Sequence, residues 1–177
     1  MTVSRDERTA LADLLLSVGP DAPTLCEGWT TRDLAVHLVV REYRPDAAAG
    51  MFLGPARTHL EKVTGDVSAR PYEDLVASYR HGPPRWNPMR LVDRFANLTE
   101  NFVHHEDVRR GGGEWFPRAL PKETRDALWR ATGFASRGLI IPSGPTVRLV
   151  RTDGAGGDGD TVTVGRGTPD VTVTGAA

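Results

Sequence analysis

Cysteine is almost absent from this sequence, because Cys26 is the only cysteine in 177 residues. A single thiol cannot form a disulfide within the chain, and it cannot build a zinc site that needs several cysteines. We expect Cys26 to be an inert loop or buried thiol. The alternative is a redox-sensitive or metal-contacting thiolate, which no basic neighbour in the sequence supports.

Long hydrophobic runs are also missing. No apolar stretch approaches the roughly 20 residues that a membrane-spanning helix needs, and residues 1–13 lack the apolar centre of a secretory signal. The formal net charge is only -1, so neither a nucleic-acid-binding surface nor a polyacidic partner is indicated. We expect a cytoplasmic protein without membrane or nucleic-acid partners, as a monomer or a homodimer.

Helical periodicity covers most of the first 140 residues. A content of 39% apolar and 25% charged residues is typical of a globular chain rather than a disordered one. Apolar positions recur every three or four residues, and Pro45 falls inside the second pattern, where a kink or an earlier end is expected. The expected helices cover residues 4–18, 31–49, 56–63, 72–80, 91–110 and 121–139.

The period then changes from helical to alternating. Residues 146–151, 161–164 and 171–174 alternate between apolar and polar side chains, which predicts three short strands. The glycine-rich segment 153–160 predicts a hairpin loop between the first two. Helices followed by strands favour a mainly α fold, a helical bundle with a small α+β appendage, over a doubly wound sheet. We expect a helical domain over residues 1–115 and a small C-terminal domain over residues 116–177.

His37 lies on the second expected helix, which has a clear start. Thr30 is a suitable N-cap, Asp33 stands three residues later as in a capping box, and Trp29 is expected to cover the core as a hydrophobic staple. His37 shares a helix face with apolar Leu34, so its ring nitrogens need partners inside the protein. It is either a core histidine bonded to a backbone carbonyl or a metal ligand.

Glu100 and His104 are four residues apart on a later expected helix, so their side chains share one face and can converge on one ion. The same spacing is also common for a solvated surface pair. His105, with Asn101 four residues before it, is a competing ligand, and the periodicity does not choose between the two histidines.

Three ligands of the types found at His37, Glu100 and His104 describe a metal site with one open position. Water or a substrate thiol bound there would be acidified by the ion. Asp107 stands three residues after His104 and is expected either to orient an imidazole from outside the ligand set or to form a surface ion pair. Glu106 and the two arginines at 109 and 110 indicate a charged, solvated helix end, with anion binding as the alternative.

Two sequence segments together resemble one known family. The run Leu-Cys-Glu-Gly-Trp-Thr-Thr-Arg-Asp-Leu-Ala-Val-His-Leu over residues 25–38 resembles the signature around the first metal histidine of the mycothiol-dependent maleylpyruvate isomerase family. The run Glu-Asn-Phe-Val-His-His-Glu-Asp-Val-Arg-Arg over residues 100–110 is similar to the second signature of that family. The family belongs to the DinB-like superfamily of four-helix bundles. The resemblance covers residues 1–140 well and the tail more loosely, and it is closest to a subgroup described only as metal-binding.

This resemblance implies a ligand set and a chemistry. It makes His37 the first metal ligand and Glu100 and His104 the other two, which favours His104 over His105. It also implies a divalent ion, usually zinc, and mycothiol as thiol cosubstrate. Members isomerise a cis double bond through a thiol adduct or transfer the thiol to an electrophile. The implied function is a mycothiol-using transferase or isomerase that acts on a small electrophile, with the metal-bound thiolate as nucleophile.

The tail departs from the family pattern. Relatives continue past the last strand into a further helix and strand, whereas this sequence stops soon after residue 174, so an incomplete C-terminal domain is expected. In the isomerase, residues of that domain hold the substrate carboxylates, and no catalytic or cofactor-binding residue can be assigned to this sequence. The alternative function is a non-catalytic metal-binding bundle, a sensor or structural partner, with the same three ligands and a filled or closed fourth position.

Overall fold

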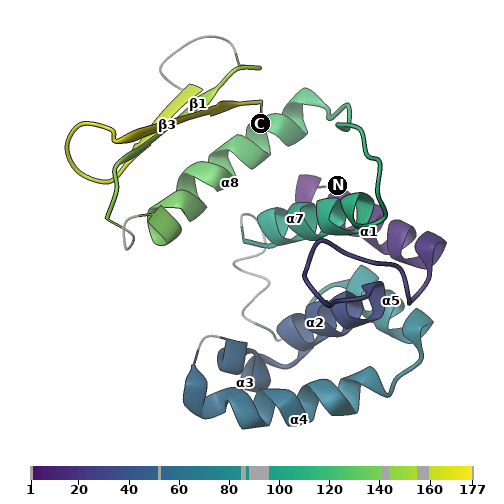
Figure 1. The fold of residues 1–177 in the computed structure, drawn as a ribbon. Coiled ribbons are helices and arrows are strands. Elements are labelled where there is room, and N and C mark those ends of the chain that lie inside the picture. Colours follow the sequence, from purple (N-terminus) through teal and green to yellow (C-terminus); the bar gives the residue numbers. More distant parts are fainter. Residues whose placement is uncertain are drawn as a thin grey trace. The chain divides into compact units, whose positions relative to one another are not determined.

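The chain is mainly helical and carries a small sheet near its C-terminal end (Figure 1). The computed structural model describes residues 2–51, 53–84, 87, 96–140, 144–154 and 160–176. Within it the chain divides into two compact units, Met1–Pro117 and Arg118–Ala177. The expectation of a mainly α fold with a C-terminal appendage is therefore confirmed. None of the described helices combines the length and the apolar character needed to cross a membrane.

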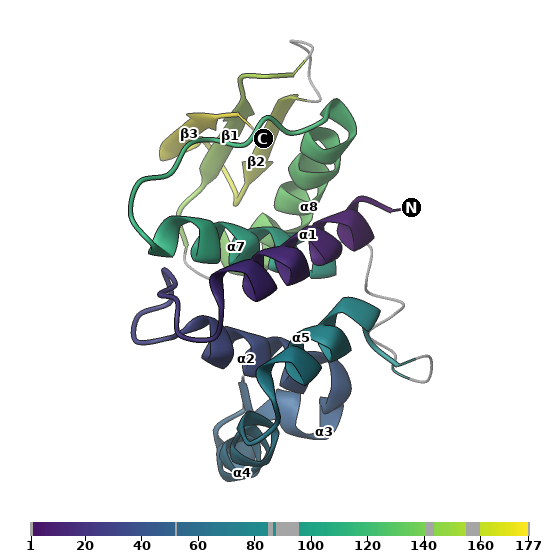
Figure 2. The same cartoon turned by 90° about the vertical axis from the view of Figure 1, so that its right-hand side faces the viewer.

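Apart from one isolated β-bridge between Pro23 and Thr30, the regular elements described in the first unit are all helices. In chain order these are α1 (Val3–Val18), α2 (Thr31–Tyr43), α3 (Pro45–Ala48), the short 3-10 helices η1 (Ala49–Met51) and η2 (Gly54–Ala56), α4 (Arg57–Ser68), α5 (Tyr72–His81) and α7 (Ala96–Gly111). Helix α1 packs along α7, and α2 packs against α4 and α5 (Figure 2). The helix that corresponds to α7 is expected to start near residue 91, and that start lies outside the described residues.

Two helices differ from their expected bounds for local reasons. The helix expected over 31–49 ends at Tyr43, and α3 begins at Pro45, because proline cannot donate the backbone hydrogen bond that would continue α2. The helix expected over 56–63 runs on to Ser68 through Gly65. Val63 and Val67 are buried on its inner face, so packing outweighs the cost of a glycine inside a helix.

The start of α2 is fixed by the expected capping box. The backbone N–H of Asp33 donates to Thr30 Oγ1 at 3.3 Å, and the backbone N–H of Thr30 donates to Asp33 Oδ2 at 2.9 Å. These bonds satisfy amides that the first turn of a helix cannot pair internally. The cap therefore sets the position along the chain at which α2 begins, and with it the direction of His37.

A buried polar network ties α1 to the other helices of this unit. Arg8 Nη1 donates to Glu42 Oε2 on α2 at 2.6 Å and to the carbonyl of Tyr79 on α5 at 2.8 Å. Glu7 pairs with His105 on α7. Around these pairs, the apolar core is built from α1, α2, α4, α5, Ala47 of α3 and Val108 of α7. Because buried charges must find partners, these pairs define which faces of the helices meet.

The second unit holds α8 (Lys122–Ile140) and three strands, β1 (Val147–Arg151), β2 (Thr161–Val164) and β3 (Val171–Gly175). Strand β1 is central. It pairs antiparallel with β2, with Val147 opposite Val164, and parallel with β3, with Val147 opposite Val171. The expected hairpin between the first two strands is confirmed, although residues 155–159 of its loop lie outside the described residues. Arg151 on β1 donates a hydrogen bond from Nη1 to Oδ1 of Asp126 on α8 at 2.8 Å.

Candidate metal centre

The structure brings His37, Glu100 and His104 together from two helices. Glu100 Oε1 lies 3.2 Å from His37 Nε2 and 3.3 Å from His104 Nε2. One ligand atom from each of the three side chains lies within 4.8 Å of the other two. Ligand atoms at this mutual spacing can reach one ion at the roughly 2.0–2.2 Å typical of zinc with small side-chain movements. The donor set therefore fits a divalent cation.

The rotation of α7 about its axis decides which histidine faces α2. Asn101 and His105 point into the core, where Asn101 accepts from the hydroxyl of Tyr79 at 2.8 Å and His105 Nδ1 lies 2.7 Å from Glu7 Oε1. Glu100 and His104 each stand one position earlier and therefore face His37. Periodicity leaves open whether His104 or His105 faces His37. The buried partners Tyr79 and Glu7 decide it, because they hold Asn101 and His105 in the core.

Glu100 is a carboxylate held by positive neighbours. An ionised carboxylate only accepts hydrogen bonds, so both imidazoles must donate from Nε2 to the shared Oε1 atom. Arg41, one turn after His37 on α2, brings Nε to 3.4 Å from the same oxygen. Burial by itself raises the pKa of Glu100, but the hydrogen bonds from His104 and His37 and the charge of Arg41 outweigh it and hold that pKa well below its usual range.

His104 has a carboxylate on each side of its ring. Its Nε2 faces Glu100, and its Nδ1 lies 2.9 Å from Asp107 Oδ2. Burial lowers the pKa of His104, but the two carboxylates outweigh burial and raise it, because the doubly protonated ring can donate to both. A cation that replaces the Nε2 proton would leave Nδ1–H directed at Asp107, which is the arrangement that orients metal-bound histidines. Asp107 thus lies where the sequence spacing suggests.

Cys26 lies on the other side of Asp107. Its Sγ is 3.5 Å from Asp107 Oδ2, and burial together with the charge of Asp107 raises the pKa of the thiol. Cys26, His104 and Asp107 also form a close group of three metal-ligand atoms. The loop that carries Cys26 is held to α7 by the N–H of Leu25, which donates to the Asp107 carbonyl at 3.1 Å. A protonated thiol at this position is the expected inert form.

The charged residues that end α7 pair with one another. Arg109 Nη1 donates to Glu106 Oε1, and Arg110 Nε donates to Glu106 Oε2, each at 2.8 Å. Arg110 also stacks on Trp115, with its guanidinium carbon 3.8 Å from the ring centroid. The Glu106 side chain is buried rather than solvated as expected, because both arginines cover it. The arginines neutralise Glu106, so the arrangement does not favour the anion-binding alternative.

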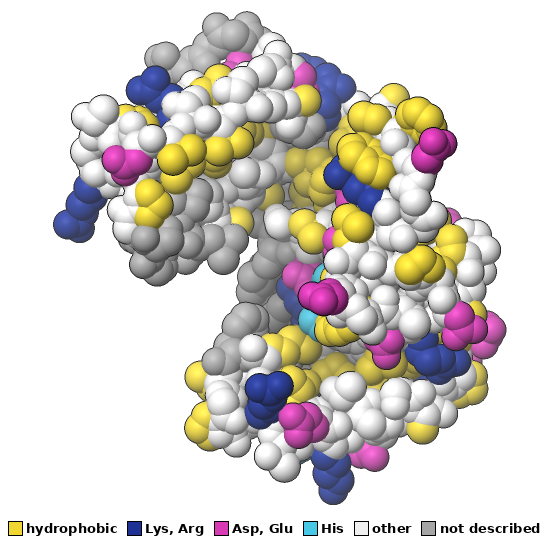
Figure 3. Space-filling view, in the orientation of Figure 1, with side chains coloured by type: hydrophobic (Ala, Val, Ile, Leu, Met, Phe, Trp, Pro, Cys, Tyr) yellow, Lys and Arg dark blue, Asp and Glu magenta, His cyan; other side chains and the backbone are white. Residues whose placement is uncertain are grey.

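A cavity of about 910 Å³ opens beside the three side chains, and His37 and Glu100 form part of its wall. Trp29 also lines it, with its ring centroid 5.3 Å from that of His37 and 38% of its surface exposed, so it covers the site rather than the core. Figure 3 shows histidine side chains on the surface of this unit beside acidic and basic ones. The sequence pattern singles out neither this cavity nor Arg41, because the walls come from helices whose packing is not encoded in any local motif.

These features are established by the geometry of this chain alone. The three side chains, the oriented imidazole and the adjoining cavity form one site within residues 1–117. No protein-family model matches the chain, and comparison with curated proteins and with solved structures gives no match either.

Proposed function

We propose that this protein binds one divalent cation, zinc in the first instance, through His37, Glu100 and His104, and uses it to activate a thiol toward a small electrophile. The observation that carries the proposal is the convergence of these three ligand atoms at the wall of a large cavity. Two imidazoles and one carboxylate are the ligand types of catalytic zinc sites, which keep a coordination position for the reactant.

The bound ion would supply a Lewis acid that lowers the pKa of a coordinated thiol, so that the thiolate is present near neutral pH. The protein's own residues do the rest. His37 and His104 would hold the ion from two helices. Asp107 keeps the His104 ring in one orientation, and the cavity offers the electrophile a place beside them. Transfer of the thiol to the electrophile, or isomerisation through a reversible thiol adduct, are the reactions that this arrangement supports.

Mycothiol as the thiol, and a DinB-like four-helix bundle as the fold, are part of the same proposal. What supports the fold is that α1 packs against α7 and α5, and that α5 in turn packs against α2. What supports the thiol is the resemblance of residues 25–38 and 100–110 to the two signatures of the mycothiol-dependent family, together with the position of their histidines and carboxylate at one point.

Zinc titration followed by thiol titration tests the proposal. The metal-free chain is titrated with zinc by calorimetry, and the loaded protein is then titrated with mycothiol and with 2-mercaptoethanol. We expect one zinc per chain and thiol binding that depends on zinc. Both should be lost in His37→Ala and Glu100→Gln and kept in the matched control His59→Ala, whose imidazole pairs with Asp46 away from the site.

Two outcomes contradict parts of the proposal. A chain that takes up no divalent cation overturns it entirely. Zinc uptake without thiol binding overturns the thiol chemistry and supports the alternative function, a non-catalytic metal-binding bundle that serves as a sensor or a structural partner.

A further inference from the structure

The cavity beside the proposed metal site has a strongly uneven wall. Helices α2, α3 and α4 and the segment η1 contribute mostly hydrocarbon to it, including Val36, Val40, Ala48, Met51 and Leu60. Val36 and Val40 stand on the same face of α2 as the metal-ligand candidate His37, and both belong to the buried core. An apolar wall continuous with the core is rigid, and it favours a ligand with a hydrocarbon body.

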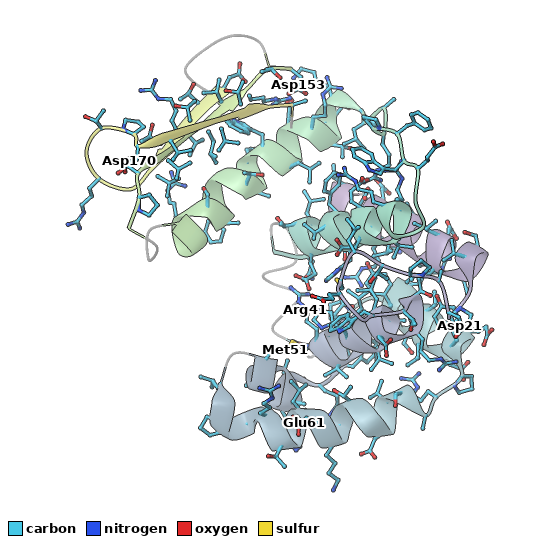
Figure 4. All side chains as sticks on the ribbon, in the orientation of Figure 1. Asp21, Arg41, Met51, Glu61, Asp153 and Asp170 are labelled. Carbon is cyan, nitrogen blue, oxygen red and sulfur yellow. The ribbon has the colours of Figure 1, made fainter. Side chains whose placement is uncertain are left out.

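Arg41 places one cation at the edge of this apolar wall. It lines the cavity one helical turn after His37, and its side chain is 15% exposed. Figure 4 shows Arg41 and Met51 on the same side of this unit, Arg41 from α2 and Met51 from the segment that follows α3. A ligand that extends along the apolar wall therefore ends beside a guanidinium.

The guanidinium keeps hydrogen-bond donors available. Its Nη1 donates to Asn97 Oδ1 at 2.7 Å, and its Nε lies 3.4 Å from Glu100. Its Nη2 has no partner among the residues that the structure describes. An arginine held in place through Nε and Nη1 can still donate from Nη2 to an added carboxylate.

The charges around the cavity also favour an anion. Among the described lining residues the acidic ones are Asp33 and Glu100. Asp33 is engaged by the capping box with Thr30, and the charge of Glu100 would be taken up by the proposed cation. Arg41 is then the positive group that an anion entering the cavity would meet, in a partly buried setting where its charge is poorly screened.

We infer that the electrophile handled at this site is an amphiphilic monoanion, a carboxylic acid with a hydrocarbon body, whose carboxylate binds Arg41 and whose hydrocarbon lies along α2, α3 and α4. The inference rests on the proposed function for the reaction and names the substrate class of the same site. The thiol holds the open position of the ion, so the carboxylate binds the arginine, and the carbon chain passes the thiol on its way into the cavity.

A chain-length series tests this inference. Butanoate, hexanoate, octanoate and decanoate are titrated by calorimetry into the full-length protein, with and without zinc, and octanol serves as the uncharged counterpart of octanoate. We expect affinity to rise by up to about fourfold for each added methylene until the cavity is filled. Octanoate should bind at least about tenfold more tightly than octanol, because a hydrogen bond between a guanidinium and a carboxylate is roughly twice as strong as one between neutral groups.

Variants separate the two parts of the ligand. Arg41→Gln should remove the preference for octanoate over octanol in the metal-free protein, where the loss of its contact with Glu100 cannot act through the ion. Arg57→Gln, a change at an exposed arginine paired with Glu61, should change neither this preference nor zinc binding. Ala48→Phe should abolish the chain-length dependence by filling the cavity. Leu60→Gln, a milder change on the facing wall, should reduce it.

Equal affinities along the series, or an octanoate preference that survives Arg41→Gln, would overturn the inference. Zinc uptake tests the proposed function by itself. The titrations of the metal-free protein test this inference independently, because they still measure how the apolar wall and Arg41 contribute to carboxylate affinity.

Discussion

A single imidazole with a carboxylate on each side has two different states in this protein. Without a cation, the protonated ring of His104 can donate from both nitrogens, to Glu100 and to Asp107. With a cation it must release the proton on Nε2 and keep the one on Nδ1. Glu100 and His104 can therefore belong to an ion-pair cluster or, with His37, to the proposed metal site, and the exchange between the two would be a proton for a cation.

This exchange predicts a pH dependence. Because its carboxylate neighbours raise the pKa of His104 above its usual value near 6.5, the protonated ring stabilises the metal-free fold below that pH. The contribution is lost as pH rises through the raised pKa. Apparent zinc affinity should therefore climb by about tenfold per pH unit for one released proton and level off only above the raised pKa. Zinc competition titrations between pH 5.5 and 8.5 measure this slope, and a flat profile would contradict the scheme.

Replacing the two adjacent histidines separates their roles. His104→Ala should weaken zinc binding by more than about 100-fold, because even the outer partners of metal ligands change affinity by about 10–100-fold. His105→Ala should leave zinc affinity nearly unchanged but lower the free energy of unfolding by about 2–4 kcal/mol, since it removes the buried partner of Glu7. Zinc titration and urea unfolding of both variants give the two values, and the reverse ranking in zinc affinity would exclude His104 as the ligand.

Single residues could be predicted from the sequence only where a local pattern identifies them. The spacing of Glu100 and His104 is such a pattern, and so is the cap formed by Thr30. The choice between His104 and His105 is different, because it depends on Glu7 and Tyr79, which approach α7 from distant segments. Hydrophobic periodicity does not predict which face of α7 is buried, because that face carries polar residues. Asn101 and His105 stand where apolar side chains would have marked the buried face.

Between elements, the loop before α2 and the end of α7 meet at a glycine. A Cβ on Gly111 would lie 2.6 Å from the Cα of Thr24 and even closer to the carbonyl of Pro23. The loop carries Cys26 and Trp29, which flank the metal-ligand candidates. The absence of a side chain at one position of α7 therefore allows the loop to pack where it completes the site.

The matched pair Gly111→Ala and Gly112→Ala tests this contact. The first should destabilise the protein by about 1–3 kcal/mol and loosen the loop, because the added methyl meets backbone atoms that cannot rotate away. The second has no atom within 4 Å of the added Cβ and should change stability by less than about 0.5 kcal/mol. Urea unfolding and Trp fluorescence report both effects, and equal stabilities would show that the loop is not packed this closely.

At this scale the sequence predicts the presence of helices better than their ends. The end of α2 just before Pro45 could be predicted from the proline itself. Gly65 gives the opposite result, because α4 continues through it to bury Val67 against the core. The cavity has no sequence signal at all, since α2, α3 and α4 each contribute a few ordinary apolar residues to its wall.

On the scale of the whole molecule, the metal-ligand candidates and the cavity both belong to the first unit. Among the residues that the structure describes, its hydrophobic core extends from Leu11 to Val108 and includes none from the second unit. A unit with its own core can fold alone. A fragment of residues 1–117 should therefore fold cooperatively and bind zinc with the affinity of the full chain. Circular dichroism and zinc titration check this, and a folded fragment that has lost zinc binding would assign part of the site to residues 118–177.

The packing of α1 along α7 has a consequence for synthesis of the chain. His37 and Glu100 are separated by 63 positions, so the first leaves the ribosome long before the second. Arg8 can meet Glu42 and Tyr79 as soon as α2 and α5 have emerged, but Glu7 must wait for His105 on α7. The nascent polypeptide therefore holds this part of α1 uncovered during that interval, and the two halves of the candidate metal centre can meet only when α7 docks.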